Sequence, residues 1–359
     1  MKLTESRCPK TELGFTIKVI RTWVLIFFIK TKPSNSVLRD RIYALWNPEC
    51  YHGWNKSKKF FEGWYYKIIS ADQKHALAII PGIAMDEHGT KQAFIQVLDG
   101  RNLKASYHKF DAQDFKPNPK KHDLEILGNR FTSDSIELNL PNLKGSLRFK
   151  NLNPWSSSWS SPGIMGPFAF VPFMECYHGI LSMDHNTEGS LEHNGEIISF
   201  DQGKGYMEKD WGHSFPEGYV WMQSNHFSKP GISVKASIAK IPWLGSSFIG
   251  HIAGVLIDGE LIEFTTYNGT RLKHCSISEK QVCLQMENKQ YALSINATRE
   301  KATALAAPIS GFMDARIEES MNAHLQVQLT DRKAGKIILE DIGTSAGTEV
   351  AGNHNVLLK

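Results

Sequence analysis

Three titratable side chains lie close together in the segment 203–216, at Glu208, Asp210 and His213. Residues two apart in a strand face the same side, so the carboxylates of Glu208 and Asp210 would repel each other. Such repulsion holds a proton on one of the two groups, which makes that group a candidate general acid. A histidine can accept or release a proton near neutral pH. This segment is therefore a candidate catalytic centre.

A further carboxylate, Glu62, lies in the aromatic run F-F-E-G-W-Y-Y-K over residues 60–67. If Glu62 points into this apolar wall, desolvation raises its pKa, and a protonated carboxyl becomes available near neutral pH. The alternative is that Glu62 pairs with Lys67 or caps a strand end, while the aromatic residues form ordinary core.

Polar residues also interrupt an apolar strand over residues 219–226, at Gln223 and Asn225. Side chains two apart in a strand point to the same side, so these amides would form a polar patch in an apolar pocket. Buried amides need hydrogen-bond partners, which a ligand hydroxyl, other side chains or water can supply.

Metal and nucleophile chemistry have weaker support. Glu175 and His178 have a spacing that would suit metal ligation on a helix, but Pro167 and Pro172 disfavour a helix there. No G-x-S-x-G motif occurs, and Ser214 is only the sequence neighbour of His213. We therefore predict no metal and no catalytic triad.

The composition excludes several classes of protein. With 359 residues, 41% of them hydrophobic and 22% charged, the chain is globular and long enough for one large or two ordinary domains. Its formal charge is +4, and residues 1–60 carry 12 Lys and Arg against 4 Asp and Glu. The body is thus mildly acidic, which disfavours a nucleic-acid partner. Five scattered cysteines fit a reducing compartment, so we expect a cytoplasmic location.

The basic residues at the start flank a short apolar stretch over residues 23–29. Seven apolar residues are too few to span a bilayer, which needs about 20. The segment 15–32 could instead lie at a membrane interface, or residues 1–33 could be an extension with no role. A short amphipathic helix is expected over residues 34–46.

From residue 60 onward the pattern is β. Apolar runs at 254–257 and 260–264 flank Asp258-Gly259, and runs at 282–286 and 291–295 flank a second turn, so both pairs predict hairpins. No β-α-β alternation, G-x-G-x-x-G or P-loop is present. Residues 151–172 indicate a long structured loop. The pattern predicts an all-β barrel or sandwich.

Several of these segments resemble the tocopherol cyclase family. The plant enzymes have a run similar to residues 60–65, and a K-N-W-G-x-x-F-P run followed by W-x-Q-x-N that is similar to residues 208–216 and 221–225. The ending 346–352 is also similar, so the resemblance extends over about residues 47–352. Asp210 and His213 depart from the plant pattern, which has Asn and Gly there. The chain is also shorter, and it looks more like bacterial-type members.

The resemblance implies ring closure of a prenylated hydroquinone to a chromanol, without a cofactor or a metal. An acid protonates the first double bond of the prenyl tail, and the phenol oxygen captures the tertiary cation. On this interpretation Glu62 or Glu208 is the acid, and Asp210 or His213 accepts the phenolic proton. The substrate-binding residues would be aromatic side chains around the cation and two amides on the hydroxyls: Trp64, Tyr66, Trp211, Trp221, Gln223 and Asn225.

The resemblance also implies two calycin-like (lipocalin-type) β-barrel domains side by side, which we place at residues 34–200 and 201–359, with the loop 151–172 near their junction. The partner would be a small hydrophobic prenyl lipid. The main alternative is a non-catalytic, lipocalin-like carrier of a prenyl lipid, quinone or pigment, because its pocket would have the same composition.

Overall fold

The computed structural model describes residues 42–358 of the chain. The expected extension 1–33 and its membrane-contacting segment 15–32 lie outside these residues. Of the helix expected over residues 34–46, the described part 42–46 is helical. No helix within residues 42–358 is long and apolar enough to cross a bilayer.

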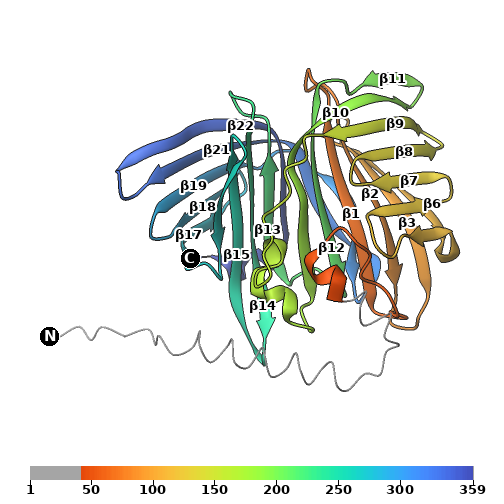
Figure 1. Cartoon of the computed structure of the whole chain (residues 1–359), viewed down its shortest axis with the longest axis horizontal. Coiled ribbons are helices and arrows are strands. Elements are labelled where there is room, and N and C mark those ends of the chain that lie inside the picture. The colour runs from red at the N-terminus through yellow and green to blue at the C-terminus, as the bar shows by residue number, and fades with distance from the viewer. Residues whose placement is uncertain (1–41, 359) are drawn as a thin grey trace.

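Two antiparallel sheets lie side by side and contain all the strands that the structure describes (Figure 1). Across the first sheet the order is β4 (Lys104–Asp111), β3 (Lys91–Asp99), β2 (Ala76–Met85), β1 (Phe60–Ile69), β12 (Gly203–Gly212), β10 (Cys176–His193), β9 (Leu143–Lys150), β8 (Ser135–Leu140), β7 (Asn129–Thr132), β6 (Asp123–Ile126) and β5 (Phe115–Pro117). The short strand β11 (Glu196–Ser199) pairs with β10.

The second sheet has the order β16 (Glu260–Thr265), β15 (Ser246–Ile257), β14 (Ile232–Trp243), β13 (Gly218–Ser224), β22 (Lys336–Gly352), β21 (Phe312–Asp331), β19 (Tyr291–Thr298), β18 (Gln281–Glu287) and β17 (Arg271–Ile277). Strand β20 (Thr303–Ile309) pairs with β21. Short 3₁₀ segments are η1 (Ala112–Asp114), η2 (Gly163–Phe170) and η3 (His354–Leu357).

Each sheet curls over a hydrophobic core of its own, and a third core fills the space between the sheets. In β1, Trp64 and Tyr66 pack into the first core, whereas Tyr65 packs into the core between the sheets. In β13, Met222 faces the second core and Trp221 the shared one. Strands buried on both faces lack a polar side, which explains their near-continuous apolar sequences.

The all-β class and both hairpins are confirmed. Asp258 and Gly259 have φ values of 49° and 85° in the turn between β15 and β16, as a tight hairpin turn requires. Closed barrels are not confirmed, because within residues 42–358 no ladder joins β4 to β5 or β16 to β17. The sheets are curved but open.

The chain changes sheet between β12 and β13, at residues 213–217. The proposed domain boundary after residue 200 lies one strand earlier than this change. Strand β12 belongs to the first sheet because it pairs with β1, about 140 residues away in sequence. The local composition around β12 does not indicate this pairing.

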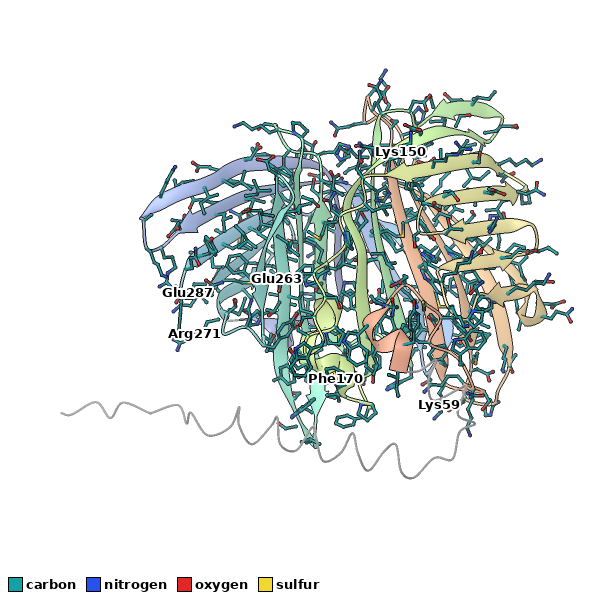
Figure 2. All side chains as sticks on the ribbon, viewed as in Figure 1. Lys59, Lys150, Phe170, Glu263, Arg271 and Glu287 are labelled. Atoms are coloured by element: carbon teal, nitrogen blue, oxygen red, sulfur yellow. The ribbon has the colours of Figure 1, made fainter. Side chains whose placement is uncertain are left out.

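The loop 151–172 is free of regular strand, contains the whole of η2, and reaches the junction of the sheets. Its Trp155 is buried in the shared core and lies against Gly254 of the second sheet. Phe170 lies at the end of the molecule where η2 and the helix 42–46 meet the sheets (Figure 2). Its ring contacts Trp46 at 5.6 Å between centroids.

Candidate active site

A cavity lies between the two sheets, with an empty volume of about 1140 Å³ that includes its opening to solvent. Strands β1, β10 and β12 of the first sheet and β13, β14 and β20–β22 of the second contribute to its lining. The wall is mostly apolar and aromatic; its aromatic members are Phe61, Tyr65, Phe94, Phe215, Tyr219 and Trp221. An apolar cavity with few polar groups is typical of a small-molecule site.

Side chains along β12 point alternately to its two faces, and this alternation determines which of them reach the cavity. Glu208 and Asp210 line it, as their spacing predicts. The residues between and after them, Lys209 and Trp211, face the core of the first sheet, where Lys209 meets Glu62 and Trp211 packs. Glu208 and Asp210 are thus together, while Glu62 lies on the opposite face.

His178, on β10, completes a polar group with these two carboxylates. It lies opposite Asp210 in the ladder, and its Nδ1 is 2.7 Å from Asp210 Oδ1. Its Nε2 is buried, makes no hydrogen bond, and is 3.6 Å from Glu208 Oε2. A carboxylate at Asp210 can only accept, so it holds a proton on Nδ1 and leaves Nε2 as the nitrogen that can take up or release a proton. A base therefore borders the cavity.

Glu208 is only 5% exposed, and its Oε2 accepts hydrogen bonds from the Tyr206 hydroxyl and from Trp221 Nε1 at 3.0 Å. Burial raises its pKa; His178 opposes this rise and Asp210 adds to it. Glu208 is therefore a carboxyl whose ionisation is disfavoured, while two neutral donors hold one of its oxygens in place.

Two further carboxyls line the cavity, the buried Glu319 and the half-buried Glu349, and sequence reasoning missed both. Glu319 on β21 and Glu349 on β22 lie directly opposite each other in the ladder. The Tyr65 hydroxyl donates to Glu319 Oε1, and the Tyr219 hydroxyl donates to Glu349 Oε2 at 2.8 Å. Burial raises the pKa of Glu319 to about 7, and burial together with Glu319 raises that of Glu349 well above its usual value.

The lysines nearest to these carboxyls are engaged elsewhere. Lys67 Nζ donates to Gln223 Oε1 and to the Ser345 carbonyl, both at 2.8 Å, and Lys235 Nζ donates to Ser237 Oγ at 2.7 Å. Burial lowers the pKa of Lys67 to about 7 and that of Lys235 to about 8. Neither lysine neutralises a carboxylate by direct contact.

Glu62 has the opposite environment, which corrects the expectation of a raised pKa. It is fully buried, but its Oε1 lies 2.5 Å from Lys209 Nζ, and both of its oxygens accept the His52 backbone N–H at 2.9 and 3.0 Å. Burial alone would raise its pKa, yet Lys209 and His52 together lower it. Glu62 is therefore ionised and paired.

One partner of Glu62, His52, belongs to a segment of residues 44–54, and the other, Lys209 on β12, also holds this segment. Lys209 Nζ also donates to the Pro48 and Cys50 carbonyls, and Trp64 Nε1 donates to the Glu49 carbonyl at 3.0 Å. The two strands thereby anchor this segment.

Trp64, Tyr66 and Trp211 lie on this same side of the strands, His213 lies at the surface, and Trp221 lines the cavity between the sheets. Trp64 and Tyr66 are buried in the first core, with the Tyr66 hydroxyl 2.9 Å from His122 Nε2. Trp211 stacks between His52 and Tyr177 at centroid distances of 4.0 and 5.6 Å. His213 is exposed, and its ring is not among the groups that line the cavity between the sheets.

Trp211 and His213 border a second cavity, with an empty volume of about 2170 Å³ that includes open solvent. Residues 42–60 and 162–174 form most of its apolar wall. Met165, Met174 and His178 line both cavities, so these three side chains belong to the wall between the two spaces.

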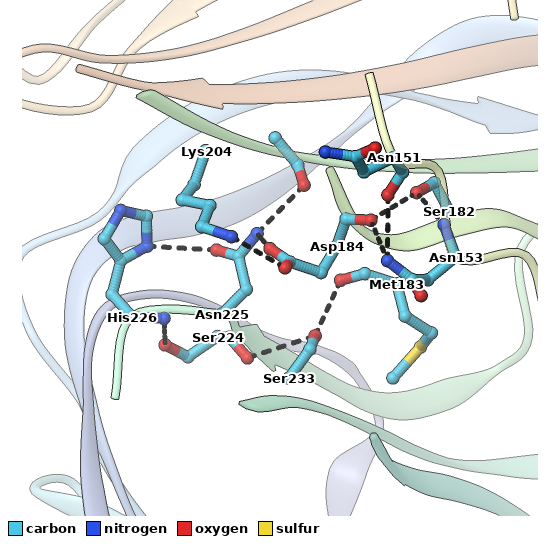
Figure 3. A network of polar contacts seen from close by, with 11 residues as sticks. Asn151, Asn153, Ser182, Met183, Asp184, Lys204, Ser224, Asn225, His226 and Ser233 are labelled. Atoms are coloured by element: carbon cyan, nitrogen blue, oxygen red, sulfur yellow. Dashed lines mark hydrogen bonds and ion pairs between the residues drawn. The ribbon is translucent and has the colours of Figure 1, made fainter. Parts of the chain in front are cut away.

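Gln223 and Asn225 point toward the first sheet but do not line the cavity. Gln223 accepts from Lys67 and has an unpartnered, buried Nε2. Asn225 Nδ2 donates to Asp184 Oδ1 at 3.0 Å and to the Gly205 carbonyl at 2.9 Å, while Lys204 pairs with the same carboxylate (Figure 3). Asn225 is thus part of a contact that joins the two sheets.

His178, Glu208 and Asp210 offer ligand-type atoms within 4.8 Å of one another, so the trio could in principle hold a metal. However, Asp210 is bonded to Nδ1, which places it behind the ring, away from a metal that Nε2 would bind. Only Nε2 and Glu208 would then remain as ligands, fewer than a protein zinc site uses. The arrangement fits an oriented base better than a metal centre.

Comparisons with known proteins bear on this geometry. The family model described as tocopherol cyclase-like matches residues 146–352, which include His178, Glu208, Asp210, Glu319 and Glu349 but not Glu62. The chloroplastic tocopherol cyclase of Zea mays is 29% identical over 199 residues, which cover 52% of this chain and 41% of that protein. A probable chloroplastic tocopherol cyclase of Oryza sativa subsp. japonica is likewise 29% identical over 199 residues, with 52% and 42% covered. The chain therefore spans about two fifths of the length of these relatives.

Two solved structures have a similar fold. CghA with Sch210972 is 10% identical, with a TM-score of 0.53 and coverage of 82% of this chain and 88% of that one. A putative AttH from Nitrosomonas europaea is 14% identical, with a TM-score of 0.51 and coverage of 84% and 94%. These likenesses concern the fold alone. The family match, which takes in more than half of the sequence and all the carboxyls that line the cavity, shows that the chain belongs to the tocopherol cyclase-like family.

Proposed function

We propose that this chain is a cyclase that closes a prenylated hydroquinone to a chromanol by protonating the double bond nearest to the ring. The observation that carries the proposal is the set of buried carboxyls with raised pKa values in an aromatic, apolar cavity. A carboxyl that is uncharged near neutral pH can act there as a general acid. Family membership supports the same reaction class.

The two cavities suggest how such a substrate would lie. The aromatic head and the reacting double bond would occupy the cavity between the sheets, with the phenol near His178 Nε2. The remaining prenyl tail would extend past Met165 and Met174 into the second cavity, whose wall is apolar. Burial of the tail would contribute most of the binding free energy, since it removes a large apolar surface from water.

The reaction is balanced without a redox partner. The π electrons of the double bond take a proton from a carboxyl and form a C–H bond, which leaves a tertiary cation. A lone pair of the phenol oxygen then forms the new C–O bond, and the phenolic proton passes to His178 Nε2. Proton exchange with water restores both groups. The faces of Trp221 and Tyr65 border the cavity and would stabilise the cation.

This assignment differs from the sequence-based roles in its base and in most of its binding residues. Glu208 stays among the acid groups, and Asp210 acts by orienting His178. Glu62, Trp64 and Trp211 become structural residues, because they anchor segment 44–54 or pack around it. The carrier alternative has no comparable use for three carboxyls with raised pKa values in its pocket.

The test is to incubate the full-length protein with a geranylgeranylated benzoquinol in deuterated water and to analyse the products by chromatography and mass spectrometry. Substrate and chromanol are isomers, but protonation at carbon from deuterated solvent leaves one non-exchangeable deuterium. Labelled chromanol above a heat-denatured control supports the cyclase. Quenching of tryptophan fluorescence by the quinol without labelled product supports the carrier.

His178→Gln gives a matched test of the base, and we expect a loss of about 10²–10⁴-fold in rate. The control is His193→Gln, because His193 also lies near a carboxylate, Asp99 at 3.8 Å, but does not line either cavity. Equal rates for the two variants would contradict the role of His178.

A further inference from the structure

We propose that Glu319 is the residue that delivers the proton to the double bond, through its Oε2 oxygen. This inference rests on the proposed cyclisation and names its proton donor. The sequence alone indicates Glu62 or Glu208 as the proton donor and does not indicate Glu319.

The hydrogen bonds of Glu319 leave one oxygen free. Its Oε1 accepts the Tyr65 hydroxyl, whereas its Oε2 is buried and has no hydrogen-bond partner. The side chain is 1% exposed and lines the cavity. An ionised Oε2 would be an unsatisfied buried acceptor, which is unfavourable. A protonated Oε2 presents a proton that no protein group accepts, so the proton remains available to a substrate.

Glu208 differs in this respect. Its Oε2 accepts both the Tyr206 hydroxyl and Trp221 Nε1, and His178 Nε2 lies 3.6 Å away. Hydrogen bonds donated to a carboxyl stabilise its charged form. Glu208 is thus better suited to stabilise the cation after it forms, while Glu319 is better suited to give up the proton.

The titratable groups around Glu319 fit a neutral carboxyl. They are Tyr65 and Lys67 on β1, Cys176 and His178 on β10, Glu208 and Asp210 on β12, Tyr219 on β13, Lys235 on β14 and Glu349 on β22. The positive charge of Lys67 favours ionisation of Glu319. However, the Lys67 ammonium donates its hydrogen bonds to the Gln223 and Ser345 oxygens and not to Glu319. Glu208 acts in the opposite direction and raises the pKa of Glu319, which lies at about 7.

The proton balance gives the donor a definite pH dependence. Glu319 gives its proton to carbon and becomes a carboxylate, and water restores the proton before the next turnover. Only the protonated form is active, so the rate should fall as pH rises above about 7. Glu208 raises the pKa of Glu319 when it is ionised, so replacing Glu208 by an uncharged residue should move this fall to lower pH.

The experiment compares wild type, Glu319→Gln and Glu208→Gln in the deuterium-labelling assay between pH 5 and 9. We expect Glu319→Gln to lose about 10²–10⁴-fold and to lose the alkaline fall in rate. Glu208→Gln should be slower but should keep the fall, shifted to lower pH. Formate should partly restore a Glu319→Ala variant and should leave a Glu208→Ala variant unrestored, because only the first lacks a proton donor.

A second measurement does not depend on activity. The infrared carbonyl stretch of a protonated carboxyl should be present in wild type at pH 6, and Glu319→Gln should remove part of it. A folded Glu319→Gln variant with the wild-type rate, or with an unchanged carbonyl band, overturns the inference alone. A wild-type protein that forms no labelled chromanol overturns the proposed function and the inference together.

Discussion

The two faces of strands β1 and β12 bury charge in opposite ways. On the face toward the first core, Glu62 touches the ammonium of Lys209 and accepts the backbone N–H of His52. On the face toward the second sheet, Glu208 accepts hydrogen bonds from a tyrosine and a tryptophan. Within residues 42–358, no Lys or Arg nitrogen lies within 4 Å of a carboxylate oxygen of Glu208, Glu319 or Glu349.

This difference separates structural from chemical use of a buried carboxyl. A carboxylate paired with a cation keeps its charge, so it can hold neighbouring segments together but cannot supply a proton. A carboxyl that neutral donors surround keeps its proton to higher pH. The aromatic motif around Glu62 therefore anchors segment 44–54, while the carboxyls that we propose as acids lie on the other face of the sheet.

The largest effect is expected for Glu62→Gln, measured as the free energy of unfolding in urea. The substitution leaves the buried Lys209 without its partner, and loss of one member of a buried ion pair typically destabilises by about 3–5 kcal/mol. We expect Glu319→Gln to change the free energy of unfolding by less than about 1 kcal/mol at pH 5, because glutamine resembles the protonated acid. Similar losses in the two variants would contradict the comparison.

The pH dependence of the same measurements should have opposite signs on the two faces. The pKa of Glu319 is higher in the folded than in the unfolded state, so its contribution is present below about pH 4.5 and is lost as pH rises through about 7. Glu319→Gln should therefore gain stability relative to wild type between pH 5 and 8, by about 2–3 kcal/mol.

The pKa of Glu62 is lowered, so its contribution is present at neutral pH and is lost as pH falls. The deficit of Glu62→Gln should thus shrink in acid. Urea titrations at four pH values would give, for each variant, the slope against pH of its free energy of unfolding relative to wild type. Slopes of the same sign would show that the environment of Glu62 or of Glu319 is wrongly assigned.

The sequence predicted those features that depend on neighbours along one strand. The spacing of Glu208 and Asp210 places them on one face whatever the tertiary structure, and the Asp258-Gly259 turn defines its own hairpin. It could not predict which face of β12 meets the second sheet, because that follows from pairing with β1 far away in sequence.

Glu319 and Glu349 were missed for the same reason. They meet across β21 and β22, where three irregularities shift the register, so no spacing in the sequence predicts the pair. One local signal was available: Glu349 is the single charged residue in the apolar ending 346–352. A charged residue inside an apolar strand is the same kind of signal that marks Gln223 and Asn225 as candidate site residues.

A smaller effect is expected for Asn225→Ala, which tests whether that amide is structural. The change leaves Asp184 Oδ1 and the Gly205 carbonyl without the buried amide donor, while Lys204 still pairs with Asp184 Oδ2, and it should reduce the free energy of unfolding by about 1–3 kcal/mol. The KM of the folded protein for the quinol should not change, since Asn225 does not line the cavity. A raised KM with unchanged stability would instead support the sequence-based role in hydroxyl binding.

The smallest effect is expected for Tyr219→Phe, which removes the hydroxyl that donates to Glu349 Oε2. Burial and the neighbouring Glu319 disfavour the charged form of Glu349, so we expect the lost bond to join two uncharged groups and to be worth about 0.5–1.5 kcal/mol in the free energy of unfolding. That loss should be the same at pH 6 and pH 8. If Glu349 were ionised at pH 8, the bond would be to a charged group, and the loss would rise to about 1.5–3 kcal/mol there. A pH-dependent loss would therefore mean that the face toward the second sheet also holds a permanent charge, and the contrast between the two faces would be one of degree.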